Sequence, residues 1–257
     1  MRMARLLFLA SVILIFPLVC SSQEPSGTFF EANQAYNKGD YDRAISLYEK
    51  LLGSGESNGL LYYNLGNCFF RKGELGKAIL NYRKSELYNP RNEDLKANLS
   101  YVRQSIKDKV EAGGGGVRKR IFFWYYDLNL KEIFIFFLIF NWIFWVSAIL
   151  KLFKSFTLLK AIFFISLFLM LMSGISAATK IYEMENFKDG VVLAEEVSVR
   201  SGDSITDTVI FNLHEGTEIE ILDSSDGWLK IRLPHGSKDM RGWVERKFVG
   251  VVDLKTT

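Results

Sequence analysis

Two uncharged apolar runs most constrain what this chain can fold into. Ile133–Leu150 and Ala161–Ala178 are equal in length and are rich in Phe, Ile and Leu. At 1.5 Å per residue, a helix of this length spans about 27 Å, close to the hydrocarbon thickness of a bilayer. Only the short segment 151–160 separates the runs. We therefore predict a transmembrane helical hairpin over residues 131–179, which returns the chain to the side it came from.

The N-terminus predicts an export signal over residues 1–22. Arg2 and Arg5 precede the apolar stretch Leu6–Val19, and small serines follow it. This is the usual order of basic start, apolar core and cleavage site in a signal peptide. Three fates remain open: cleavage near Cys20, retention as an anchor, or lipidation at Cys20.

Each of these fates exports residues 23–130, and the hairpin then exports residues 180–257 as well. Basic residues flank both ends of the hairpin, so the positive-inside rule gives this orientation only partial support. We expect a protein of the bacterial inner membrane whose two soluble modules face the periplasm or exterior.

A repeating pattern runs through residues 28–88. The matched pairs are Gly39 and Gly73, Ala44 and Ala78, and Tyr48 and Tyr82, all at the same spacing. A period of about 34 residues is typical of the tetratricopeptide repeat, in which neighbouring helix pairs stack into one continuous core. The second copy resembles the consensus of that family at Tyr62, Leu65, Gly66, Phe69, Gly73, Ala78, Tyr82 and Pro90.

We expect two helices over residues 28–52, two more over 60–88, and one helix over 93–111. The last helix carries Leu95, Leu99 and Val102 on one face and is predicted to cover the open end of the second repeat. The repeat positions that usually face a concave groove form a candidate peptide-binding site. They are Asn33, Tyr36, Asn37, Tyr63, Asn67, Phe70 and Arg71. The alternative interpretation of the same residues is an ordinary solvated helix face.

Some repeat proteins grip a C-terminal carboxylate with two Asn residues and several cations. Asn33 and Asn64 match that spacing, but Phe29, Asp94 and Asn98 stand where the cations belong. We therefore reject a carboxylate clamp.

After Lys180 the pattern changes to short strands separated by Gly, Asp and Ser turns. We expect five strands, at Val191–Val199, Val209–Leu213, Thr217–Leu222, Trp228–Leu233 and Gly242–Val244. The order of four motifs resembles the bacterial SH3-like domain, a small barrel that is mostly a binding module. The motifs are Val199–Gly202, Leu213–Thr217, Gly227–Ile231 and Gly242–Val244. Trp228 is a candidate residue of the binding surface, and Trp243 is predicted to pack in the core.

No catalytic, metal-binding or cofactor-binding residues emerge from the sequence. Two Cys residues are too few for a disulfide framework or a cysteine-based zinc site. His214 and His235 both fall in predicted turns, where solvated side chains are expected. Cys68 is predicted to be a buried small residue; a redox-sensing thiol is the alternative. A net charge of +3 is too small to suggest a nucleic-acid partner.

The order of the modules resembles the BatE family, encoded in bacterial aerotolerance (Bat) operons. The resemblance implies neighbouring von Willebrand-type membrane proteins and a MoxR-type ATPase. It also implies a role in oxidative-stress tolerance or in the assembly of an envelope complex.

The expected fold is multidomain: an all-α repeat module, a two-helix transmembrane hairpin and a small all-β SH3-like barrel. The leading functional prediction is a membrane-anchored scaffold without enzymatic activity that binds partner proteins, including other Bat-type membrane proteins. The alternative is binding to peptidoglycan through the SH3-like domain. The expected boundaries are signal peptide 1–22, repeats with capping helix 28–111, linker 112–130, hairpin 131–179 and SH3-like domain 188–251.

Overall fold

The computed structural model describes residues 27–108, 120, 122–153, 156–186, 188–234 and 240–253. The predicted signal peptide, the Gly113–Gly116 linker and His235 lie outside the described residues. The chain forms two compact units. We call Trp124–Tyr182 the apolar unit, and Pro25–Phe123 together with Glu183–Thr257 the repeat–sheet unit.

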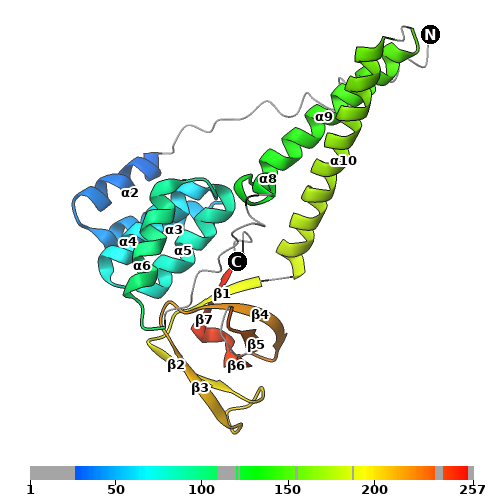
Figure 1. Cartoon of the computed structure of the whole chain (residues 1–257). Coiled ribbons are helices and arrows are strands. Elements are labelled where there is room, and N and C mark those ends of the chain that lie inside the picture. Colours follow the sequence, from blue (N-terminus) through cyan, green and yellow to red (C-terminus); the bar gives the residue numbers. More distant parts are fainter. Residues whose placement is uncertain are drawn as a thin grey trace. The chain divides into compact units, whose positions relative to one another are not determined.

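Five helices form the first half of the repeat–sheet unit (Figure 1). They are α2 (Gly27–Asn37), α3 (Tyr41–Gly53), α4 (Gly59–Lys72), α5 (Leu75–Tyr88) and α6 (Glu93–Ser105). The predicted pairs are confirmed, because the chain turns between α2 and α3 at Gly39 and between α4 and α5 at Gly73. Both glycines have φ of +80°, a conformation that other residues rarely adopt.

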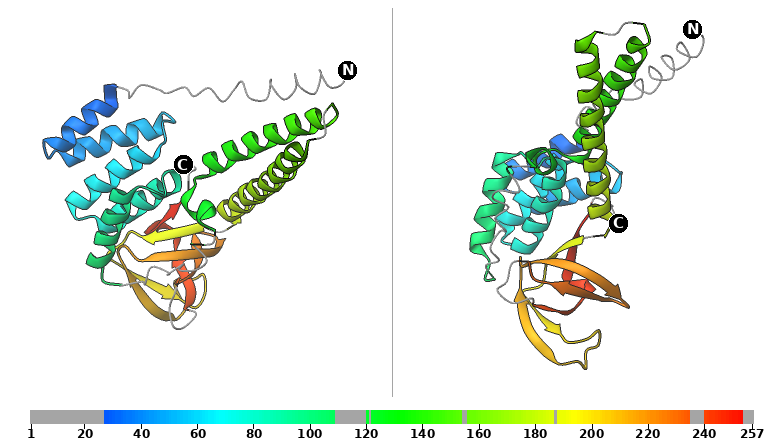
Figure 2. Two further views of the ribbon diagram at one scale, coloured as in Figure 1. Left: turned by 45° about the horizontal axis from the view of Figure 1, so that its top comes forward. Right: turned by 45° about the vertical axis from the view of Figure 1, so that its right-hand side comes forward.

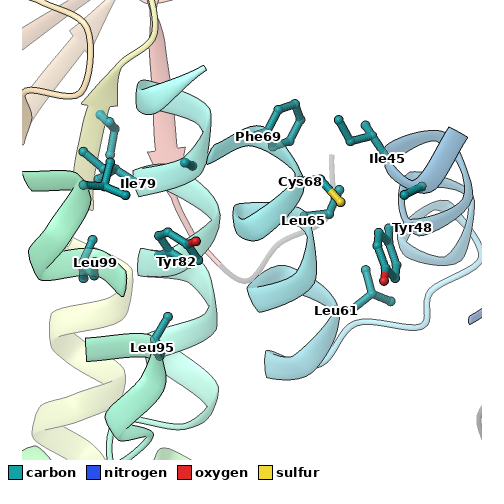
Figure 3. Packing of buried hydrophobic residues seen from close by; sticks show 14 of the residues in the cluster. Ile45, Tyr48, Leu61, Leu65, Cys68, Phe69, Ile79, Tyr82, Leu95 and Leu99 are labelled. Carbon is teal, nitrogen blue, oxygen red and sulfur yellow. The ribbon is translucent and has the colours of Figure 1, made fainter. Parts of the chain in front are cut away.

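The core between the helices is built from large residues packed against small ones (Figure 3). Tyr48 and Tyr82 are at most 1% exposed and fill the gaps between neighbouring helices. Gly66 permits the closest approach, since a Cβ at this position would lie 2.5 Å from the Tyr82 ring. The aromatic and small residues of the repeat pattern therefore have the packing roles that the pattern predicts.

Helix α6 buries the predicted face, since Leu95, Leu99 and Val102 are at most 2% exposed. The expected end of this helix at residue 111 is wrong. The helix ends at Ser105, and Ile106 is extended, with φ of −81° and ψ of 158°. The Ile106 side chain is buried in this extended conformation. Burial of the side chain therefore favours the end of the helix over a further helical turn.

The apolar unit contains most of α8 (Phe123–Asp127), all of α9 (Leu130–Lys151) and most of α10 (Thr157–Asn186). Helices α9 and α10 contain the two apolar runs and are long and apolar enough to cross a bilayer. They lie side by side in Figures 1 and 2. A capping box formed by Asn129 and Glu132 defines the start of α9.

An aromatic pair and a polar contact join the two long helices. The ring centroids of Phe144 and Phe163 lie 5.0 Å apart. The Asn141 amide of α9 reaches α10 and donates to the Met170 sulfur at 3.4 Å. Ser166 and Ser173 of α10 donate to carbonyls of their own helix, which are the nearest acceptors for a hydroxyl in an apolar environment.

The C-terminal half of the repeat–sheet unit is an antiparallel sheet of seven described strands in the order β3-β2-β6-β5-β4-β1-β7. The strands are β1 (Lys188–Val192), β2 (Glu196–Arg200), β3 (Val209–His214), β4 (Glu218–Ser225), β5 (Trp228–Arg232), β6 (Arg241–Glu245) and β7 (Val249–Val252).

The predicted single strand Val191–Val199 is wrong, because the chain breaks at residues 193–195 into β1 and β2. Strand β1 pairs with β4 and β7, whereas β2 pairs with β3 and β6. The break therefore moves the chain from one side of the sheet to the other. Strand β7 was not predicted, because so short a segment, with Gly250 inside it, carries too little pattern.

Candidate functional site

A hydrogen-bonded polar ladder runs across the first helices of the repeats. The Tyr48 hydroxyl donates to Asn33 Oδ1 at 2.6 Å, and the Asn64 amide donates to the same oxygen at 3.1 Å. Asn33 therefore ties α2 to α3 and to α4. Burial raises the pKa of Tyr48 to about 12, so this hydroxyl remains a donor at physiological pH.

The same ladder recurs one repeat later. The Tyr82 hydroxyl donates to Asn67 Oδ1 at 2.8 Å, and the Asn98 amide donates to it at 3.1 Å. Asn98 also donates to the Tyr63 hydroxyl at 3.1 Å. Burial raises the pKa of Tyr82 as well. The carbonyl oxygens of Asn33 and Asn67 thus accept hydrogen bonds from other residues of the repeats.

The other predicted groove residues lie nearer the surface. Tyr36 packs edge-on against Tyr41, with ring centroids 5.5 Å apart. A hydrogen bond with Tyr36 raises the pKa of Arg71, whose charged side chain lies at the surface. Phe70 packs edge-on against Tyr101 at 5.7 Å. Asn37 is exposed.

Three large apolar side chains of the repeats are strongly exposed among the described residues, and each is on a first helix. Phe30 of α2 is 70% exposed, Leu60 of α4 is 56% exposed and Tyr101 of α6 is 61% exposed. Sequence reasoning missed all three. The repeat register gave no signal for them, because Phe30 and Tyr101 are one period from Asn64 and Asn67, which belong to the polar ladder. We call Phe30, Leu60 and Tyr101 the exposed apolar set.

The second candidate surface is the outer face of β5 and β6. Inward-facing Leu229, Ile231 and Val244 are buried, so the alternate residues Trp228, Lys230 and Trp243 face outward.

The predicted core position of Trp243 is therefore wrong. Its neighbour Gly242 is buried against Val199 and leaves no room for a side chain on the inner side. Trp243 instead lies opposite Lys230, whose ammonium group is 5.7 Å from the ring centroid. Trp228 lies on the same face and is half-buried.

The predicted solvated side chain of His214 is wrong, because the imidazole is paired with Asp108 and Lys107. Its Nδ1 lies 2.9 Å from Asp108 Oδ1, and its Nε2 lies 2.6 Å from the Lys107 ammonium. Because ammonium is only a donor, Nε2 accepts and Nδ1 carries the proton. The nearby Thr217 hydroxyl donates to Asp108 and not to His214 Nε2. The arrangement therefore lacks the hydroxyl–imidazole pair of nucleophilic catalysis.

Cys68 is fully buried, as predicted. Burial raises the pKa of its thiol to about 12, which disfavours the reactive thiolate. Among the described residues, no cluster of three or more His, Cys, Asp or Glu side chains has the arrangement needed to hold a metal ion.

Comparisons with known families agree with this architecture. Residues 31–90 match the tetratricopeptide repeat, and residues 195–250 match the bacterial SH3 domain. A comparison of the chain with curated proteins found no match. Both matched families are typically non-catalytic and suggest binding to proteins or to the cell wall.

Proposed function

We propose that this chain is a non-enzymatic, membrane-anchored scaffold that binds a partner protein in the groove of its repeats. The exposed apolar set carries the proposal. Phe30, Leu60 and Tyr101 leave large apolar surfaces in water on three helices that otherwise bury their apolar faces. Because apolar side chains gain about 25 cal/mol per Å² on burial, a partner that covers them supplies binding energy.

The groove is suited to a peptide with apolar side chains. The polar ladder holds α2, α4 and α6 in register through Asn33 and Asn67. A preformed surface loses little entropy on binding. Arg71 supplies one positive charge beside Tyr36 for a carboxylate or carbonyl of the peptide.

We also propose the cellular setting. Helices α9 and α10 anchor the protein in the bacterial inner membrane, and both modules face the periplasm or exterior. The partners are other Bat-type membrane proteins, in a complex linked to aerotolerance or oxidative stress. The order of repeats, apolar hairpin and SH3-like domain along the chain supports this setting.

Site-specific photo-crosslinking in native membranes tests the scaffold. A photo-reactive residue replaces Tyr101 in the full chain, and a matched control replaces Lys50, which is exposed on the second helix α3. We expect a discrete protein adduct from position 101, reduced at least about fivefold by Phe30→Ala, and none from position 50. Equal yields from both positions contradict a partner in the groove.

Binding to peptidoglycan is the second candidate function. Trp228, Trp243 and Lys230 share the outer face of β5 and β6 and combine stacking surfaces with a positive charge. Such a face suits a sugar ring or an anionic peptide of the cell wall.

Retention of the detergent-solubilised full chain on purified sacculi tests this second function. We expect Trp228→Ala to lower retention at least about fivefold. The control Ile205→Ala removes an apolar side chain that is 69% exposed in a loop of the same domain, and it should leave retention unchanged. Absence of retention for the unmodified chain rules out peptidoglycan binding.

A further inference from the structure

The repeat pattern continues past the two complete repeats for one more helix, α6, which has no second helix after it among the described residues. Helix α6 occupies the position of a third first helix, because Asn98 lies one repeat period after Asn64. An acidic residue precedes each of the second helices α3 and α5, at Asp40 and Glu74. Asp108 is the next acidic residue at the same period. Asp40 caps α3 by accepting the backbone N–H of Arg43 at 3.2 Å. A third repeat would begin its second helix immediately after Asp108.

Asp108 instead binds the turn between β3 and β4. It accepts the backbone N–H of His214 at 2.7 Å and the Thr217 hydroxyl at 2.8 Å. Desolvation raises the pKa of Asp108, but these bonds outweigh it and the pKa is lowered overall. The Asp108 carboxylate therefore accepts a backbone N–H at the end of β3, as the Asp40 carboxylate accepts one at the start of α3.

Ion pairs extend the contact along α5 and α6. Arg103 pairs with Glu218 through two hydrogen bonds of 2.6 and 2.9 Å. Arg83 pairs with the same carboxylate at 3.0 Å and with Asp189 at 2.7 Å. The Glu218 side chain is only 18% exposed, so solvent screens these pairs less than pairs at an open surface.

The apolar contact is continuous with the core of the repeats. Val191 of β1 and Val252 of β7 belong to the same buried cluster as Ile79 and Leu99. A Cβ on Gly216 would lie 2.6 Å from the Ile106 side chain, and a Cβ on Gly250 would lie 2.4 Å from Leu80. These glycines let the sheet approach the helices as closely as a neighbouring helix would.

We propose that the SH3-like sheet takes the place of the second helix of a third repeat and caps the repeats, so that both modules fold as one unit. Strands β1 and β7 and the β3–β4 turn are then committed to this contact. Ligand binding is left to the groove and to the outer face of β5 and β6.

Hydrogen exchange measured by mass spectrometry on the full chain in detergent micelles tests the proposal. Gly216 and Gly227 have nearly equal φ values of +85° and +86°, but a Cβ on Gly227 meets nothing within 4 Å. Gly216→Ala and Gly227→Ala therefore impose similar backbone strain on the sheet, and only the first disturbs the contact with the helices. We expect exchange in α5 and α6 to be at least about tenfold faster in Gly216→Ala than in Gly227→Ala. Equal rates in the two variants overturn the proposal.

A second pair of variants approaches the contact from the helices, in case Gly216→Ala fails to fold. Arg103→Gln removes the pair with Glu218, whereas Lys96→Gln changes an exposed cation of the same helix. We expect faster exchange in β1 and β4 only for Arg103→Gln. Unchanged exchange in both strands shows that the sheet folds independently of the helices and contradicts the proposal.

Discussion

At the scale of single residues, burial decides chemistry more than residue type does. Cys68 and the two ladder tyrosines have groups capable of ionisation, yet they lie inside the repeats. Transfer from water penalises the charged form, which raises the pKa of all three. These groups therefore contribute packing and hydrogen bonds at physiological pH.

The thiol of Cys68 provides a direct test of this effect. Its pKa is raised to about 12, so the folded thiol stays protonated as the pH rises from 7 to 9. An unfolded thiol ionises near pH 8.5 and gains reactivity over the same range. We expect iodoacetamide to label Cys68 at least about a hundredfold more slowly in the folded chain than in denaturant.

Quantitative mass spectrometry of the peptide that contains Cys68 checks the labelling rate. Cys20, where it is retained, serves as an internal control on a different segment. Rapid labelling of the folded chain at pH 7 contradicts a buried thiol and supports the redox-sensing alternative.

At the scale of elements, hydrogen bonds repeat with the same period as the apolar core. Asn33 and Asn67 each accept one tyrosine hydroxyl 15 residues later and one asparagine amide 31 residues later. The polar ladder is thus a property of the repeat and is not an isolated contact.

Replacement of Asn67 measures what the ladder contributes. Asn67→Ala leaves the Tyr82 hydroxyl and one Asn98 donor without their acceptor, which costs about 1–3 kcal/mol when such groups are buried. Asn33→Ala should have a similar effect. Asn37→Ala changes an exposed residue and should stay within about 0.5 kcal/mol of the unmodified chain.

Urea unfolding followed by circular dichroism gives the free energy of unfolding of each variant. The helical signal reports the repeats together with α9 and α10. The change in the free energy of unfolding for Asn67→Ala is therefore measured relative to Asn37→Ala. A loss for Asn67→Ala no larger than that of the Asn37 control contradicts a structural role for the ladder.

Helices and strands with a regular sequence period were predictable, and those with a weak or interrupted period were not. The four helices of the repeats follow from a regular period with glycine at the turns. The break between β1 and β2 did not follow, because Val191–Val199 read locally as one strand. The break depends on pairing, since β1 and β2 bond to different neighbours in the sheet.

At the scale of the whole molecule, the hairpin links membrane topology to function. In the proposed topology, two spans return the chain to its starting side, which places the repeats and the SH3-like sheet in one compartment. The contact of α5 and α6 with the sheet requires this same arrangement, because both modules belong to one compact unit.

Reporter fusions test the compartment. An alkaline phosphatase fusion is active outside the inner membrane, and a fluorescent protein fusion is active inside. We expect an external reading at the Gly113–Gly116 linker, an internal reading at Lys154 and an external reading at Thr257. An internal reading at Thr257 would falsify the proposed orientation.

The candidate sites were predictable only in part. The candidate groove positions stay a prediction from the repeat register. The internal partners of Asn33 and Asn67 did not follow from that register, since hydrogen bonding depends on three-dimensional distance. Trp228 and Trp243 share an outward face because Leu229 and Val244, the paired residues between them in the sheet, face inward. Strand direction alone does not reveal which face becomes the core.

The amino-acid sequence by itself determined the helix pairs, the two apolar helices and the SH3-like domain. These features depend on local periodicity, on turn residues and on the length of apolar runs. Only the tertiary structure decided how the repeats end: Asp108 and Arg103 act together with Gly216, which lies far from them along the chain. Contacts between segments so distant in sequence leave no local pattern, because each residue alone is compatible with an exposed turn or helix surface.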